Sequence, residues 1–274
     1  MPLVVIDPGH GGRDPGTSGN GYQEKTLVLS TAIMLRDALR RCGVNVLMTR
    51  ETDTLPLPSG TIGQDLAYRA DLANRNNADL FVSWHIDSAA NATVSGVAVW
   101  IYPATRGTRT ETWAQRISDG IAANTGQRNR GVYLGDFQVL RETEMDAVLV
   151  EAGFITNAQE ANNLANTEFQ RAQAEGAARA ICDLFDLPYV APVRPDPTPR
   201  PTTPPPATEQ PPAQNRPEEW PDWAEDAIRS MIEWGVMTGY PDGSWRPDQN
   251  VTRAELAVAL TRFYNFIRGG NGGV

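Results

Sequence analysis

The stretch Leu3–Gly12, LVVIDPGHGG, decides the fold of the first part of this 274-residue chain. Its unbroken apolar run predicts a short buried strand, and the proline and glycine that follow predict a sharp turn. His10 stands in that turn. The same pattern returns in Leu80–Asp87, LFVSWHID, where an apolar run leads into His85. The sequence contains two histidines, and each of them follows a predicted strand.

Strand and helix patterns alternate between and after these two segments. Apolar residues at helical spacing from Leu27 to Cys42 predict a helix that ends at Gly43. Further helices are predicted at residues 66–76, 111–123 and 167–185, and further strands at 44–49, 97–102, 137–140 and 147–150. This alternation is typical of a layered α/β domain with a covered sheet, in which ligands bind at loops beyond the strand ends.

A change in composition divides the chain. Proline recurs at short intervals from about residue 191 to residue 217, which predicts an extended linker that no helix or central strand crosses. We therefore expect a first domain at 1–190, a Pro-rich linker at 191–217, a small helical module at 218–268 and a flexible tail at 269–274. Within the module, apolar residues before Gly235 predict one helix, and a capping-box pattern from Thr252 to Glu255 predicts a second.

Composition excludes several classes of protein. The net charge of −9 and the absence of a basic stripe argue against nucleic acid as a partner. No apolar run reaches the length of about 20 residues that a membrane span requires. Cys42 and Cys182 form no CxxC pair, which excludes a zinc knuckle. Both lie among apolar residues of predicted helices, so we expect buried free thiols. The start of the chain does not resemble a signal peptide.

The two histidines indicate a metal site. Both predicted strands end at one edge of a parallel-type sheet, so His10 and His85 are expected to converge. A single histidine in such a place is more often structural, but here the pair includes every histidine of the chain. Glu24 precedes a helix and is the candidate third ligand, although it could simply favour the helix N-terminus. Two imidazoles and one carboxylate suit zinc and leave a fourth position for water.

Glu151 completes the candidate site. It ends the apolar strand at 147–150, where partial desolvation is expected to raise its pKa toward the range useful for a general base. The alternative is a carboxylate that caps a helix or forms a salt bridge. The glycines around His10 are expected to let the backbone approach the metal closely. The chain contains neither a phosphate-binding loop nor a serine nucleophile elbow.

Four segments resemble the motifs of the type 3 N-acetylmuramoyl-L-alanine amidases: Ile6–Gly16 (IDPGHGGRDPG), Glu24–Lys25 (EK), Ser83–Asp87 (SWHID) and Val150–Asn157 (VEAGFITN). The resemblance covers roughly residues 2–187 and implies a six-stranded sheet flanked by helices, with one catalytic zinc. It implies that His10, Glu24 and His85 hold the zinc and that Glu151 is catalytic. Trp84 and Ile86 depart from the family pattern, and both are expected to shape the cleft beside His85.

The C-terminal module resembles one S-layer homology repeat, most clearly at Gly235–Pro247 (GVMTGYPDGSWRP) and Thr252–Leu256 (TRAEL). This resemblance implies binding to secondary cell-wall polysaccharide. Arg253 would contact an acidic sugar substituent, and Trp245 and Tyr240 would stack on sugar rings. Alternatively, the two aromatic residues pack within a small core. A single repeat either associates with copies in other chains, giving an oligomer, or serves as a weak anchor.

The leading hypothesis is a zinc-dependent enzyme that cleaves the amide bond between N-acetylmuramic acid and L-alanine in peptidoglycan, with a wall-targeting tail. The alternatives are a zinc peptidase or carboxypeptidase acting on the stem peptides, and a cell-surface anchoring protein without activity. The enzyme is expected to act at the bacterial cell wall. A holin-released phage endolysin, a secreted autolysin whose leader is removed and a sporulation enzyme all agree with the sequence.

Overall fold

The computed structural model describes residues 1–192, 225–237 and 253–267. It divides into two compact units, Met1–Arg194 and Pro195–Val274, and each is described by itself. Most of the predicted linker and all of the predicted tail lie outside the described residues. Within the described ranges, no helix combines the length and the apolar character needed to cross a membrane.

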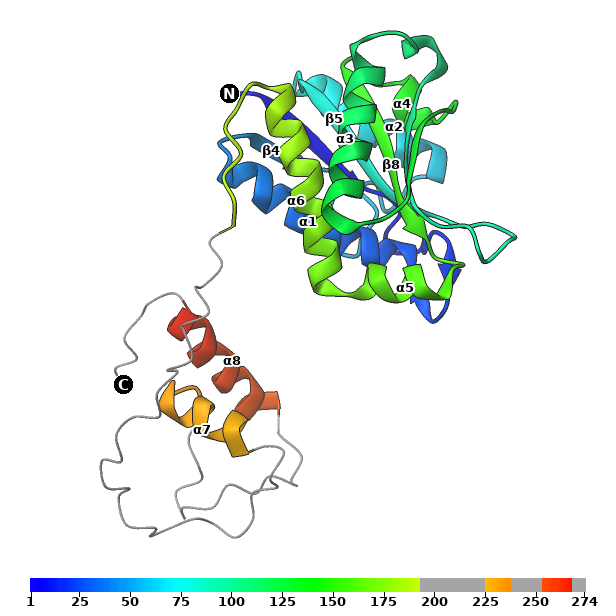
Figure 1. Ribbon diagram of the computed structural model, residues 1–274. Helices are drawn as coiled ribbons and strands as arrows, with labels where there is room; N and C mark the ends of the chain where they lie inside the picture. The colour runs from blue at the N-terminus through cyan, green and yellow to red at the C-terminus, as the bar shows by residue number, and fades with distance from the viewer. Residues whose placement is uncertain (193–224, 238–252, 268–274) are drawn as a thin grey trace, which may run out of the picture. The chain divides into compact units, whose positions relative to one another are not determined.

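The first unit is built on a six-stranded sheet, as the family resemblance implied (Figure 1). In spatial order its strands are β4 (Asn45–Met48), β1 (Leu3–Pro8), β5 (Leu80–Asp87), β8 (Asp146–Phe154), β6 (Val97–Ile101) and β7 (Asn129–Leu134). The first four are parallel, β6 runs antiparallel to β8, and β7 is parallel to β6. The central strands β1, β5 and β8 therefore bring their C-terminal ends to one edge.

Helices cover both faces of the sheet and make the expected α/β architecture. On one face lie α1 (Glu24–Arg41), α3 (Arg109–Thr125) and α6 (Thr167–Leu184), which pack on the larger hydrophobic core. The other face carries α2 (Ile62–Arg75) and the short α4 (Gln138–Arg141), over a smaller core. The remaining elements are β2 (Ser18–Gly19), β3 (Tyr22–Gln23), the 3₁₀ turn η1 (Pro103–Thr105) and α5 (Ala158–Ala165).

Helix α1 shows how the local sequence sets an element. Its apolar residues recur at helical spacing and are buried, among them Leu35 and Leu39 at 0% exposure. The helix ends at Arg41, followed by Cys42 as its C-cap and by Gly43 with a φ of 80°. That left-handed residue stops the helix as expected. Cys42 and Cys182 are both buried and free, which confirms their predicted state.

One predicted strand is wrong. Residues 137–140 form no strand: Phe137 is the N-cap of helix α4, and the next three residues belong to that helix. Gln138 donates a hydrogen bond to the carbonyl of Gly63 on α2, so tertiary packing decides the conformation of a short apolar run that is ambiguous by itself. The prediction also omitted β7 and α5. Helix α5 had a readable signal, since the Asn157 side chain accepts from the amide of Glu160 as an N-cap.

In the second unit, the structure describes two helices, α7 (Glu225–Glu233) and α8 (Arg253–Ile267). Gly235, with a φ of 67°, follows α7, so both predicted helices of the module are confirmed. Tyr240 and Trp245 lie outside the described residues, and so does the side chain of Arg253, although its backbone opens α8. Their predicted contacts with polysaccharide stay predictions.

Candidate metal centre and catalytic cleft

A cavity of about 370 Å³ opens at the C-terminal ends of the central strands β1, β5 and β8. It contains all four residues that the sequence singled out for chemistry in the first domain: His10, Glu24, His85 and Glu151. Apolar side chains of α2 and of the α4 region also line it, namely Ile62, Leu66, Phe137 and Val139. The cavity therefore joins a cluster of potential metal ligands to an apolar surface.

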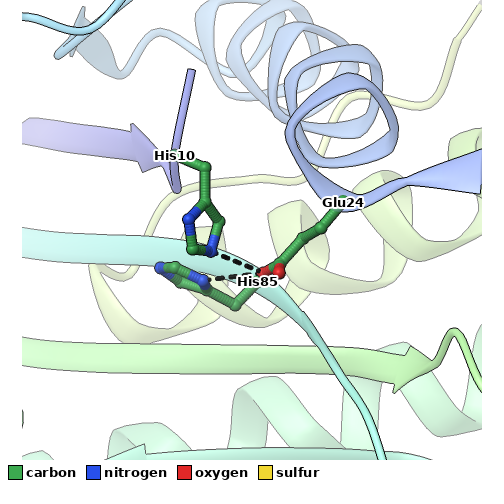
Figure 2. Close-up of side chains that lie close together, drawn as sticks. All are labelled: His10, Glu24 and His85. Carbon is green, nitrogen blue, oxygen red and sulfur yellow. Dashed lines mark hydrogen bonds and ion pairs between the residues drawn. The ribbon is translucent and has the colours of Figure 1, made fainter. Parts of the chain in front are cut away.

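The Glu24 carboxylate contacts both histidines (Figure 2). Its Oε1 atom lies 3.1 Å from Nε2 of His10 and 2.9 Å from Nδ1 of His85. One donor atom from each of the three residues lies within 4.8 Å of the other two. Zinc ligands at about 2.0–2.2 Å from a tetrahedral ion stand roughly 3–4 Å apart. Because the three donors are two imidazole nitrogens and one carboxylate, their chemistry fits zinc.

The Glu24 carboxylate is fixed before any ion binds. It is 3% exposed and belongs to the first residue of α1. Its Oε2 accepts from the amide of Thr17 at 2.8 Å, and its Oε1 accepts from the amide of Ile86 at 3.0 Å. Burial by itself would raise the pKa of Glu24, but hydrogen bonds from His10 and His85 outweigh it and hold the pKa well below its usual range. Glu24 is therefore charged, which is the form that binds a metal.

His10 is oriented from behind by Asp14. The Nδ1 atom of the imidazole lies 2.8 Å from Oδ2 of Asp14, which leaves Nε2 facing Glu24. The His10 ring meets that of His85 edge to face, with centroids 4.9 Å apart. Carboxylates that accept from the outer nitrogen of a ligating histidine fix its tautomer and orientation. Asp14 was not among the predicted site residues, although it lies in the same glycine-rich segment.

Two glycines leave the space that the ligands occupy. A Cβ atom on Gly9 would lie 2.2 Å from Cε1 of His85. On Gly16, whose φ is 66°, a Cβ atom would lie 2.5 Å from Oε2 of Glu24 and 2.6 Å from Cδ2 of His10. The main chain thus approaches the ligand side chains as closely as the glycine-rich sequence predicted.

Glu151 lies beside this cluster on the next strand. It pairs with His85 in the register of β5 and β8, and its carboxyl group lines the cavity. Its Oε2 atom is buried and has no hydrogen-bond partner among the described residues. Burial, and then the negative charges of Glu24 and Asp87, raise the pKa of Glu151 well above its usual range. A carboxyl group with one unpartnered oxygen is suited to proton transfer.

Trp84 and Ile86, the two residues beside His85 that depart from the family pattern, were both predicted to shape the cleft. Trp84 is fully buried in the core and does not line the cavity, so its predicted effect on the cleft is wrong. Adjacent residues of a strand point to opposite faces, and His85 takes the face of the cleft. Ile86 is also a buried core residue, but it is among the residues that line the cavity, and its backbone amide donates to Glu24.

Comparison with known proteins supplies the family. The family model described as N-acetylmuramoyl-L-alanine amidase matches residues 4–183. The chain belongs to this amidase family. It is 37% identical over 189 residues to the sporulation-specific N-acetylmuramoyl-L-alanine amidase of Bacillus subtilis (strain 168), covering 68% of this chain and 69% of that protein. It is 36% identical to the endolysin of Bacillus phage SPP1, covering 68% of this chain and 66% of that protein.

Solved amidase structures share the fold. The catalytic domain of CwlV, an N-acetylmuramoyl-L-alanine amidase from Bacillus (Paenibacillus) polymyxa, superposes with a TM-score of 0.61 at 31% identity, covering 69% of this chain and all of that one. An N-acetylmuramoyl-L-alanine amidase from Clostridium difficile 630 gives a TM-score of 0.62 at 32% identity, over 68% and 97% of the two chains. At the other end of this amidase, residues 217–257 match the S-layer homology domain model.

Proposed function

We propose that this chain hydrolyses the amide bond between N-acetylmuramic acid and L-alanine in peptidoglycan and acts at the bacterial cell wall. The observation that carries the proposal is the meeting of two imidazoles and a buried carboxylate with the unpartnered oxygen of Glu151 in one cavity. Relatives that carry the name of this activity support the choice of substrate.

We infer that Nε2 of His10, a carboxylate oxygen of Glu24 and Nδ1 of His85 hold one zinc ion. Support comes from the donor types, their separation and the hydrogen bond that orients His10. When bound, zinc supplies Lewis-acid chemistry that makes water a stronger nucleophile and polarises the scissile carbonyl. Glu24 contributes a negative charge that offsets part of the charge of the ion.

Glu151 then acts as the general base and acid. Its unpartnered Oε2 takes a proton from water as the water oxygen forms a bond to the carbonyl carbon of the lactyl group. As the carbon–nitrogen bond breaks, Glu151 gives that proton to the leaving nitrogen of L-alanine. The products are a free lactyl carboxylate and a peptide with a free N-terminal amine.

The decisive experiment compares two glutamate substitutions. Glu151→Gln is expected to keep one bound zinc and to lose hydrolysis of purified peptidoglycan, because the amide cannot accept the proton. Glu144→Gln, at an exposed position outside the cavity, is the matched control and is expected to keep full activity. Undiminished turnover by Glu151→Gln would overturn the assignment.

Mass spectrometry of the digest separates the amidase from the peptidase alternative. An amidase exposes the amine of L-alanine and releases intact stem peptides. A peptidase or carboxypeptidase exposes the amine of a diamino acid or releases D-alanine, and the glycan stays linked to L-alanine. Neither product is expected from a protein that serves only as an anchor.

We further propose that the C-terminal module binds secondary cell-wall polysaccharide. The match of residues 217–257 to the S-layer homology domain supports this role. Arg253 would contact an acidic sugar substituent, while Trp245 and Tyr240 would stack on sugar rings.

A further inference from the structure

In the loop that carries His10, every carbonyl oxygen from Pro8 to Gly12 accepts a hydrogen bond. The carbonyl of Gly11 accepts from the amide of Asp14 at 3.0 Å, which closes the turn locally. The other four accept from three cationic side chains that come from distant parts of the chain: Lys25, Arg50 and Arg69. The loop is therefore held from outside, by charged groups on three separate segments.

Arg50 is the most unusual of these three cationic side chains. It is only 4% exposed and, within the described residues, forms no ion pair with a carboxylate. Burial, with Arg69 nearby, lowers the pKa of Arg50 to about 10. A buried cation whose acceptors are all neutral carbonyls is costly to a fold. A contribution to stability therefore does not explain why an arginine occupies this position. The positions that its hydrogen bonds impose on the main chain are the better explanation.

That geometry joins two ligand-bearing segments. Arg50 Nε donates to the carbonyl of Pro8 at 2.9 Å, and Nη2 donates to that of Gly9 at 2.7 Å, just before His10. The same Nη2 donates to the carbonyl of Lys25 at 2.9 Å, one residue after Glu24. One planar guanidinium thus fixes the loop of His10 against the first turn of α1.

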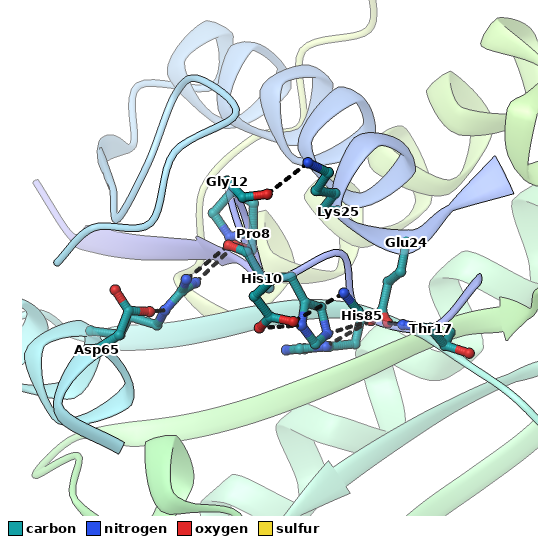
Figure 3. Close-up of polar contacts among 12 residues, drawn as sticks. Pro8, His10, Gly12, Thr17, Glu24, Lys25, Asp65 and His85 are labelled. Carbon is teal, nitrogen blue, oxygen red and sulfur yellow. Dashed lines mark hydrogen bonds and ion pairs between the residues drawn. The ribbon is translucent and has the colours of Figure 1, made fainter. Parts of the chain in front are cut away.

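Arg69 holds the other side of the loop. Its Nη1 donates to the carbonyl of Pro8 at 2.9 Å, and its Nη2 to that of His10 at 2.8 Å. Unlike Arg50, it is paired with two buried carboxylates, those of Asp7 and Asp65. Figure 3 draws the polar contacts of this region: Asp65 lies at the left, Pro8 and Gly12 lie close together near the centre, and the Lys25 side chain reaches Gly12 from the right.

The backbone conformation of His10 is unusual, and the two arginines hold it. Its φ is 63°, a left-handed conformation that residues other than glycine rarely adopt. Gly11 and Gly12 continue the positive-φ turn at 128° and 54°. A residue keeps a strained backbone conformation only where contacts with its surroundings hold it there, and such strain is concentrated at functional sites. Here the carbonyls on both sides of the His10 Cα, those of Gly9 and His10, accept from Arg50 and Arg69.

We propose that Arg50 and Arg69 are positioning residues that hold His10 in its left-handed conformation against Glu24, so that the metal site is formed before the metal binds. This inference rests on the proposed zinc site. Removal of the Arg50 guanidinium frees the carbonyls of Pro8 and Gly9 and lets His10 relax away from Glu24. Zinc affinity then falls, because binding must also restore the strained loop.

The test measures zinc affinity in metal-free protein by competition with a chelating dye, so that no catalytic turnover enters the readout. Arg50→Gln is expected to bind zinc about 10–100-fold more weakly than the wild type, the range typical of lost supporting contacts around metal ligands. Arg50→Lys is expected to have a zinc affinity between those of the wild type and Arg50→Gln, because one ammonium group cannot reproduce the hydrogen bonds of the planar guanidinium. Thermal unfolding and circular dichroism of the metal-free proteins report the fold separately.

Arg41→Gln is the matched control. Arg41 also donates to a carbonyl, that of Val190, and pairs with Glu175, but neither partner belongs to the His10 loop or to the first turn of α1. It is expected to lower the thermal midpoint without changing zinc affinity. If Arg50→Gln does not fold, Arg50→Lys decides the question. Wild-type zinc affinity in a folded Arg50 variant overturns the inference alone, whereas a wild-type protein that binds no zinc overturns the proposed function as well.

Discussion

Nδ1 of His10 lies 2.8 Å from Oδ2 of Asp14, and this contact turns Nε2 of the same ring toward Glu24. The two residues are four positions apart in a turn closed by the hydrogen bonds between Gly11 and Asp14. The turn therefore brings its own orienting carboxylate to the histidine that it carries. The zinc chemistry proposed for this site depends on that orientation.

Asp14→Ala is accordingly expected to weaken zinc binding by about 10–100-fold, because the imidazole loses the partner that fixes its tautomer. Isothermal titration of the metal-free variant measures the effect. Asp136→Ala, which removes an exposed carboxylate paired with Arg141, serves as the control and is expected to bind zinc as the wild type does. Equal affinities in the two variants would contradict a role for Asp14.

Gly16→Ala is expected to abolish tight zinc binding, because the new methyl group would lie 2.5 Å from Oε2 of Glu24. Gly21→Ala is the matched control, since Gly21 also has a positive φ, 85°, but a Cβ atom there meets nothing within 4 Å. Both variants should lose about 1–2 kcal/mol from backbone strain. Metal content after dialysis distinguishes them, and comparable zinc loss in both would show that strain alone is responsible.

Zinc removal is expected to lower the thermal midpoint of the first unit. Zinc at 100 times its dissociation constant stabilises the native state by about 2.7 kcal/mol, provided that the unfolded chain does not bind it. For a domain of this size, that corresponds to roughly 5–10 °C. Calorimetry with and without a chelator measures the shift, and Glu151→Gln should show the same shift because Glu151 is not a proposed ligand. No shift in either protein would argue against a bound metal.

Asp7 is expected to contribute to stability at neutral pH but not in strong acid. It is 1% exposed, and it accepts from Arg69 at 2.8 Å and from Thr49 and Ser83 at 2.6 and 2.7 Å. Burial alone would raise the pKa of Asp7, but the guanidinium and the hydroxyls outweigh it and lower the pKa below its ordinary value of 3.8. Its contribution is therefore present above pH 3.8 and lost as the pH falls through the lower native value.

Asp7→Asn should accordingly cost about 3–5 kcal/mol at pH 7, because Arg69 is left without one buried partner. Urea unfolding of metal-free protein between pH 7 and pH 2 measures both effects. The difference between wild type and variant should shrink at the acid end. A difference that is independent of pH would mean that the carboxylate charge is not what stabilises this pair.

Arg253→Ala is expected to reduce co-sedimentation of the full chain with purified cell walls, because the proposed contact with an acidic sugar substituent is lost. Hydrolysis of soluble muropeptides should be unchanged, since the catalytic cavity belongs to the first unit. Arg262→Ala, at an exposed position of the same helix, controls for a general loss of positive charge. Equal wall binding by wild type and both variants would remove Arg253 from the proposed contacts.

Local sequence predicted most of the fold of the first domain. The apolar runs before His10 and His85 correctly indicate β1 and β5, and helical spacing from Leu27 onward gives α1. His10 follows the end of β1 as predicted, but β5 continues through His85 to Asp87. These features depend on neighbours along the chain, so periodicity reveals them. The prediction failed at residues 137–140 and omitted β7, because a short segment takes its conformation from the element it packs against.

The apolar strand patterns of the sequence by themselves predicted that His10, His85 and Glu151 meet in the cavity, since parallel strands bring their ends to one edge. Glu24, at the start of α1, depended more on the family resemblance. Only the tertiary structure decided how they are held. Arg50 reaches Gly9 across 41 positions, and Arg69 reaches His10 across 59. Such hydrogen bonds leave no periodic trace in the chain, because they depend on how α2, β1 and β4 pack. The strained conformation of His10 is likewise a property of the folded molecule.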